Sequence, residues 1–128
     1  MGDIEIAALW RFLPVGYALT VAIELPILLV ALSPQHSWPR RLAAGFWLTA
    51  VTYPMVVLVL PVLMAQYSRV AYLAVAETFA PAAECALFWW AFGGGEPGGW
   101  RWRDFAAIVA ANLASFAMGE WLHRYAAI

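Results

Sequence analysis

The chain has 128 residues, of which 65% are hydrophobic and only 12% are charged, whereas a soluble domain carries about 25% charged residues. The seven basic residues are all arginines, and a net charge of −1 leaves no basic surface for a nucleic acid. Cys85 is the single cysteine, so the chain has neither an internal disulfide nor a cysteine-based zinc site. The composition therefore excludes a soluble domain, a nucleic-acid-binding protein and a disulfide scaffold.

Four apolar stretches are each long enough to cross the bilayer core, which takes roughly 20 helical residues. We predict these spans at Phe12 to Leu32, Leu42 to Met64, Val70 to Phe92 and Phe105 to Leu122. Polar residues, proline and glycine gather in the breaks between them, and such short connections favour antiparallel neighbours. The sequence predicts an all-α, polytopic membrane protein that forms one antiparallel four-helix transmembrane bundle over residues 1–128.

Several expectations concern the polar residues near the ends of the spans. Residues 2–11 mix polar and apolar positions and predict a short helix or strand at the membrane surface. Asp104 is placed to cap the last helix, and Glu120 precedes Arg124 by four residues, the spacing of an exposed ion pair. We place His36 and His123 on opposite sides of the membrane, where they cannot share a metal or a haem, and we expect no cofactor.

Three glutamates lie well inside the predicted spans: Glu24 in the first, and Glu77 and Glu84 in the third. An acidic residue near the middle of a span costs roughly 2.5 to 3.5 kcal/mol, so such residues usually face the interior of a bundle. No basic residue lies within a predicted span to neutralise them. Either a bound proton or a bound cation must therefore offset the charge.

The depth of each polar residue follows from about 1.5 Å of rise per residue. Glu24 lies about twelve residues into its span and Glu84 about fourteen, and counting the antiparallel spans backwards brings three further residues to a similar depth. We predict one polar layer across all four helices, with Ser115 nearby: its members are Glu24, Thr52, Tyr53, Glu84 and Asn112. Glu77 precedes Glu84 by seven residues and should lie on the same helix face, about 10.5 Å away.

Prolines interrupt three of the four predicted spans, at Pro26, Pro54 and Pro81. Each proline deprives the carbonyl four residues earlier of its helical donor. Carbonyl and carboxylate oxygens are the ligands that hard cations prefer. The last span differs, because Ala107, Ala111, Ser115 and Gly119 recur every four residues and predict a ridge for close helix contact.

The stretch from Tyr17 to Glu24 is similar to the first helix of the small multidrug resistance transporters, short four-helix proteins with an essential glutamate in that helix. The resemblance covers one helix and implies that Glu24 takes part in proton-coupled export. Two glutamates in the third span, prolines in the first three spans and the lack of lysine depart from that family's pattern.

Three functions are open on this sequence. The first is transport or ion handling, in which Glu24 and Glu84 exchange a proton or cation, Glu77 lies further along the path and Asn112 orients the site. The second is a non-catalytic transmembrane subunit or assembly factor whose protonated carboxyls fix helix register. The third is an intramembrane enzyme with a glutamate as general acid or base, which has no catalytic motif in its favour.

We expect the following surroundings and partners. The protein should be a multi-pass protein of the bacterial inner membrane, in contact with the lipid bilayer. It should bind a proton, a cation or a small lipophilic ligand, and associate with copies of itself or with other membrane subunits. The seven candidate site residues are Glu24, Thr52, Tyr53, Glu77, Glu84, Asn112 and Ser115.

Overall fold

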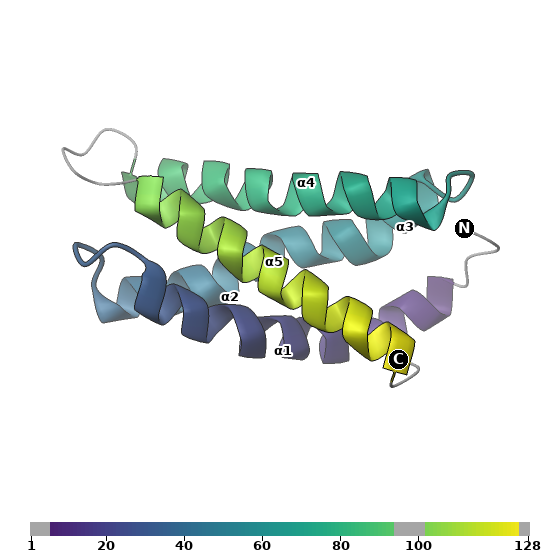
Figure 1. Ribbon diagram of the computed structural model, residues 1–128, viewed down its shortest axis with the longest axis horizontal. Helices are drawn as coiled ribbons and strands as arrows, with labels where there is room; N and C mark the ends of the chain where they lie inside the picture. Colours follow the sequence, from purple (N-terminus) through teal and green to yellow (C-terminus); the bar gives the residue numbers. More distant parts are fainter. Residues whose placement is uncertain (1–5, 94–101, 126–128) are drawn as a thin grey trace.

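The computed structural model describes residues 6–93 and 102–125, and all of its regular structure is helical (Figure 1). The elements are α1 (Ile6–Ala31), α2 (Trp38–Pro54), η1 (Met55–Val59), α3 (Leu60–Leu63), α4 (Arg69–Phe88), η2 (Trp89–Gly93) and α5 (Trp102–Tyr125). Within the described residues, four helical segments are long and apolar enough to cross a membrane, at 6–31, 38–63, 69–92 and 102–122. The predicted all-α four-helix bundle of an integral, multi-pass membrane protein is confirmed.

The helices extend beyond the predicted spans at several ends. α1 begins at Ile6 rather than Phe12, so residues 6–11 continue the first helix and do not form the separate surface segment that we predicted. The remainder of that segment, residues 2–5, lies outside the described residues. α5 begins at Trp102 and extends to Tyr125, three residues beyond the predicted end of the last span at each side. Hydropathy located the apolar centres of the spans, and the helical backbone continues past them at these ends.

Two of the helices begin at a serine that caps the first turn. Ser37 accepts a hydrogen bond from the backbone N–H of Arg40 at 3.3 Å, and Ser68 accepts one from the backbone N–H of Ala71 at 3.1 Å. A proline follows Ser37 in the first turn of α2, where its missing N–H is not needed. These caps set the start of α2 and α4 and keep the connections before them short.

The second membrane-spanning segment changes its winding after Pro54. α2 is followed by a π-helical turn, η1, and then by the short α3, which has Pro61 in its first turn. Neither proline can donate a backbone hydrogen bond, so the segment between them widens while still running in one direction. The proline pattern predicted an interruption here, and the structure has one.

α5 crosses the bundle obliquely, from the side of α4 at its start to the side of α1 at its end (Figure 1). Near its start, Ala107 and Ala111 are buried, and they pack with Leu28, Leu48 and Phe88 in the apolar core. Towards its end Ser115 is half-buried and Gly119 is exposed. The predicted small-residue ridge thus packs closely along half its length, and beyond it the helices diverge around a cavity.

Candidate functional site

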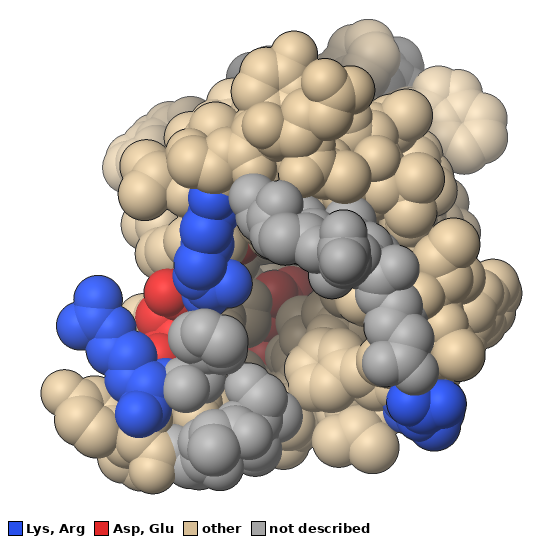
Figure 2. Space-filling view, turned by 90° about the vertical axis from the view of Figure 1, so that its right-hand side faces the viewer, with Lys and Arg blue, Asp and Glu red and all other residues tan. Residues whose placement is uncertain are grey.

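A cavity of about 470 Å³ occupies the half of the bundle where α1 begins and α5 ends. Figure 2 views this end of the molecule and shows it hollowed, with acidic side chains inside and arginine side chains at the rim. All four membrane-spanning segments contribute to the lining. We call this cavity the acidic chamber, because Glu24, Glu77, Glu84 and Glu120 all line it.

All seven residues predicted for the site line the acidic chamber. Four of them form hydrogen-bonded pairs across helices, Glu24 with Ser115 and Glu84 with Thr52, while Asn112 also joins Glu84. Tyr53 lines the chamber, but within the described part of the chain it forms no hydrogen bond with a glutamate, so only its position agrees with the predicted polar layer. The sequence thus selected residues that line one cavity, and their role in a functional site stays a prediction.

The two deepest carboxyls are held from different helices. Glu24 Oε2 accepts from Ser115 Oγ on α5 at 2.5 Å, and Oε1 accepts from Thr49 Oγ1 on α2 at 3.4 Å. Glu84 Oε2 accepts from Thr52 Oγ1 at 2.8 Å, and Oε1 accepts from Asn112 Nδ2 at 3.2 Å. Each glutamate is only 2% exposed. All these donors are neutral, so no side chain bonded to either carboxyl offers a positive charge.

Two of the donor hydroxyls also contact a backbone carbonyl. Thr52 Oγ1 lies 3.0 Å from the Leu48 carbonyl, and Ser115 Oγ lies 3.1 Å from the Asn112 carbonyl. A hydroxyl has one proton and can also accept. When the carboxyl is ionised, the hydroxyl donates its hydrogen to the carboxylate. When the carboxyl is protonated, the carboxyl donates to the hydroxyl oxygen, and the hydroxyl donates to the backbone carbonyl. Rotation of one hydroxyl hydrogen satisfies both protonation states without moving a helix.

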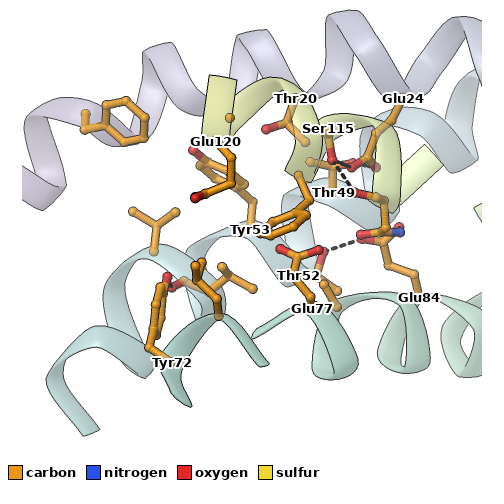
Figure 3. Close-up of a pocket in the computed structure, with 18 of the residues that line it drawn as sticks. Thr20, Glu24, Thr49, Thr52, Tyr53, Tyr72, Glu77, Glu84, Ser115 and Glu120 are labelled. Carbon is orange, nitrogen blue, oxygen red and sulfur yellow. Dashed lines mark hydrogen bonds between the residues drawn. The ribbon is translucent and has the colours of Figure 1, made fainter. Parts of the chain in front are cut away.

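Glu77 differs from the two deeper glutamates. It is half-buried in the chamber wall, and its carboxylate accepts no hydrogen bond within the described part of the chain. Figure 3 shows Glu24 and Glu84 at one end of the chamber, Glu120 and Tyr72 at the other, and Glu77 and Tyr53 between them. The carboxylate of Glu77 is therefore free to meet a ligand that approaches the deeper pair.

Arg69 and Glu120 form an ion pair between α4 and α5 at the mouth of the chamber. The side chains remain 44% and 27% exposed, respectively. We had predicted that Glu120 pairs with Arg124 on its own helix, and that prediction is wrong, because α5 turns Glu120 towards α4. Arg69 is the only basic residue among the described residues that line the chamber, and its charge is already matched.

Sequence reasoning missed several residues of the chamber. Thr49 lies one helical turn before Thr52, and this spacing could have marked it as a second hydroxyl on the same face of α2. Arg69 and Tyr72 could not have been found this way, because their position depends on how α4 packs against its neighbours. Tyr72 donates to the carbonyl of Val56 in η1 at 2.7 Å, so the widened turn also shapes the chamber wall.

The opposite end of the bundle holds a second buried polar cluster, which we call the end clamp: Ser33, His36 and Asp104. Asp104 Oδ1 accepts from the Ser33 backbone N–H at 2.8 Å, the Ser33 hydroxyl lies within 2.9 Å of both carboxylate oxygens, and His36 Nε2 lies 2.9 Å from Oδ2. Asp104 thus ties α5 to the loop after α1, and it lies in the first turn of α5, the helix that we had predicted it to cap. Ser33 and His36 both contact the carboxylate of Asp104. These three residues therefore do not form a pair of nucleophile and general base.

Arginines enclose the end clamp. Arg41 donates to the carbonyls of Leu29, Ser33 and His36, so the chain turn after α1 is tied to α2. Arg40 Nη1 lies 3.4 Å from His36 Nδ1. A guanidinium can only donate, so in this contact Nδ1 accepts and Nε2 carries the proton directed to Asp104.

Comparisons of the chain with family models, with curated proteins and with solved structures find no match in any of the three. The likeness of residues 17–24 to the small multidrug resistance transporters stays a prediction. The function is therefore argued from the acidic chamber.

Proposed function

We propose that this membrane protein binds a cation in the acidic chamber in exchange for protons carried by Glu24 and Glu84, as one step of cation transport. The hydroxyl of Ser115 or Thr52 bridges each carboxyl to a backbone carbonyl, and this observation carries the proposal. A permanently protonated or permanently ionised carboxyl needs no partner that can reverse its hydrogen bond. A carboxyl that alternates between the protonated and the ionised state does need such a partner.

Charge balance supports an exchange rather than simple cation binding. Two ionised glutamates at this depth need positive charge, and the one basic residue among the described chamber residues is paired with Glu120. An ionised carboxylate in a region of low dielectric is very unfavourable unless it is paired. The chamber can therefore hold protons or a cation, but it is unstable with neither, which couples release of the one to binding of the other.

Proton release upon cation binding tests the proposal directly. The purified protein in weakly buffered detergent solution is mixed in turn with chloride salts of sodium, potassium, magnesium and tetramethylammonium, and the pH change is recorded. We expect at least one of these cations to release protons from the parent protein. We expect Glu24→Gln and Glu84→Gln each to reduce the release, and the double variant to abolish it. If no cation releases protons from the parent, or the double variant behaves as the parent does, the proposal is wrong.

The glutamine variants should remain folded. A glutamine amide donates to the hydroxyl as a protonated carboxyl does, so Glu24→Gln and Glu84→Gln mimic the proton-loaded state. Thr52→Val tests the hydroxyl itself, and Thr78→Val is its matched control. Thr78 makes the same bond to the carbonyl four residues earlier, at 2.8 Å, but it is exposed on α4. Thr52→Val should slow proton release, whereas Thr78→Val should not.

The alternative function, a non-catalytic subunit or assembly factor, is supported by one observation. Glu24 and Glu84 together link α1, α2, α4 and α5 through side-chain hydrogen bonds, as residues that only fix helix register would do. In that case proton release is absent for every cation, and the glutamine variants differ from the parent only in stability. A stoichiometric partner that co-purifies from native membranes would identify the complex.

A further inference from the structure

The end of the bundle opposite the acidic chamber carries three arginines around the end clamp. Arg40 and Arg41 lie near the start of α2, and Arg103 lies in the first turn of α5. Helix α1 ends, and both of these helices begin, at this end of the molecule (Figure 1). Asp104 is fully buried within the end clamp. Within the described part of the chain, none of the three arginines forms an ion pair with an acidic side chain.

Arg41 is fully engaged in the fold. Its Nε, Nη1 and Nη2 atoms donate to the carbonyls of His36, Leu29 and Ser33, at 3.1, 2.6 and 2.8 Å. These carbonyls belong to the last turn of α1 and the loop after it, where the backbone acceptors lack helical donors. Arg41 therefore holds the turn between α1 and α2, and we assign it no ligand.

Arg40 and Arg103 retain N–H groups for another partner. Arg103 is exposed, and its Nε donates to the carbonyl of Ala31 at 2.8 Å. Arg40 is half-buried, with its guanidinium carbon 5.2 Å from the centroid of the Phe92 ring and Nη1 3.4 Å from His36 Nδ1. The remaining N–H groups of both guanidiniums bond to nothing in the described part of the chain. A guanidinium that is anchored in this way keeps a planar fork of donors, which matches the oxygens of a phosphate.

Exposed tryptophans place these two arginines at the membrane surface. Trp38 is 65% exposed and lies two residues before Arg40, while Trp102 is 76% exposed and directly precedes Arg103. Trp90, in η2 at the same end, is 72% exposed. Tryptophan rings concentrate at the level of lipid headgroups, because one part of the ring is apolar and its N–H is polar. Arg40 and Arg103 therefore lie at the depth of the phospholipid phosphates.

The charge at this end selects among the molecules that carry a phosphate. The phosphate of phosphatidylcholine is balanced by its own choline cation, whereas an anionic headgroup has a net negative charge that complements two guanidiniums. Two arginines are too few to hold a nucleic acid, which needs many phosphate contacts. A lipid phosphate, by contrast, is already present at this depth.

We propose that Arg40 and Arg103 bind the phosphate groups of anionic phospholipids, in the leaflet at the end clamp. Headgroup binding does not depend on the proposed cation exchange. Arg40 contacts His36, and Arg103 directly precedes Asp104, so a bound headgroup braces the end clamp in its closed arrangement.

Lipid titrations of the purified protein in mixed micelles test this proposal. Thermal unfolding is followed while phosphatidylglycerol, or phosphatidylcholine with the same acyl chains, is added, and the half-saturating lipid fraction is determined. Inorganic phosphate is titrated as well, because it offers similar oxygens without a membrane anchor. The variants are Arg40→Gln, Arg103→Gln and the double variant. Arg124→Gln is the matched control, because Arg124 is exposed on α5 at the opposite end of the bundle.

We expect phosphatidylglycerol to raise the unfolding temperature of the parent by about 5 °C, and phosphatidylcholine and inorganic phosphate to leave it nearly unchanged. Each single variant should raise the half-saturating fraction of phosphatidylglycerol about fivefold, the effect of one arginine near an anionic surface. The double variant should lose the temperature shift, and Arg124→Gln should behave as the parent does.

Three results would overturn the proposal. Phosphatidylcholine could stabilise the parent as much as phosphatidylglycerol does, or Arg124→Gln could weaken the effect as strongly as Arg103→Gln. An equal shift with inorganic phosphate would assign the two arginines to a soluble anion and not to a lipid. The unfolding temperatures in phosphatidylcholine show whether the variants are folded, and if the double variant is not, the two single variants decide the outcome.

Discussion

The two halves of this bundle bury carboxyls in different ways. In the half with the acidic chamber, Glu24 and Glu84 are bonded to neutral hydroxyls and an amide, next to a cavity. At the other end, Asp104 is fully buried against Ser33 and the imidazole of His36, and arginines close the surroundings. Hydroxyl partners can reverse their hydrogen bonds and leave a carboxyl able to change its proton, whereas Asp104 also accepts from the backbone N–H of Ser33, which can only donate. The arrangement in the acidic chamber suits the exchange of protons, and the arrangement around Asp104 suits a closed end of the bundle.

An apolar core separates the two halves. Leu28, Leu48, Phe88 and Ile108 are almost completely buried between the chamber and the end clamp. Phe88 also contacts the His36 ring, with centroids 5.0 Å apart at an interplanar angle of 82°. The chamber therefore has one open end, and any passage to the other side of the membrane requires this core and the end clamp to rearrange.

The largest expected effect comes from the same acid-to-amide change made in each half. Asp104→Asn should lower the free energy of unfolding by about 4 kcal/mol, because an amide nitrogen then faces a donor of Ser33 or His36. Glu84→Gln should change it by less than about 1 kcal/mol, because its amide can donate to Thr52 and its carbonyl can accept from Asn112. Denaturation in mixed micelles measures both. Equal losses would remove the distinction between the two halves.

Phe88→Ala tests the apolar core between them. We expect a loss of about 3 kcal/mol in unfolding free energy, because the emptied volume lies among close-packed side chains. We also expect faster proton leak across liposomes, since water from the chamber gains a route towards the end clamp. Trp90→Ala is the control, as Trp90 is 72% exposed on η2. If Phe88→Ala leaves both the proton leak and the free energy of unfolding unchanged, the barrier to proton passage lies elsewhere.

A pair of glycine substitutions tests the packing beside the chamber. Gly16→Ala should destabilise the fold by about 2 kcal/mol, because the new methyl overlaps the Tyr53 hydroxyl. Gly119→Ala should be neutral or gain up to about 1 kcal/mol, since nothing occupies the space beside it and alanine favours the helix. Thermal unfolding of both variants in one detergent measures the difference. The same response at both positions would contradict the free space at Gly119.

The smallest effect is expected at the mouth. Arg69→Gln and Glu120→Gln should each change stability by less than about 0.5 kcal/mol, because the ion pair is partly exposed and screened by water. Their effects on cation affinity should be opposite: Glu120→Gln leaves a positive charge at the mouth and weakens binding about twofold, whereas Arg69→Gln strengthens it. Titrations of tetramethylammonium at low and high salt measure both, and the difference should shrink at high salt.

The bundle and the seven candidate residues that line the acidic chamber were predictable from local sequence. Apolar stretches of about 20 residues determine helices in a bilayer, because every backbone group must be bonded within the segment. Depth follows from a constant rise per residue, so Glu24, Glu84 and Asn112 could be brought to one level by counting. Glu77 could be assigned to the same face as Glu84 for the same reason.

Partners between helices were not predictable in this way. Glu120 has Arg124 at a suitable spacing on its own helix, but the oblique path of α5 turns it to Arg69 instead. Asp104 lies in the first turn of α5, and the loop after α1 brings Ser33 and His36 to it, which its position along the chain did not predict. Both predictions relied on neighbours along the chain, whereas the strongest partner of a buried charge is whichever group packing brings within hydrogen-bond distance.

By itself the sequence determined that this chain forms four membrane-spanning helices and that three carboxyls lie within them, because hydropathy and helical rise are local properties. Only the tertiary structure decided that one half encloses the acidic chamber while the other is closed by the end clamp. The crossing of α5 produces that asymmetry: small residues pack closely at Ala107 and Ala111, and the helices separate beyond Ser115. Helix crossing depends on all the contacting surfaces together, and no single segment specifies it.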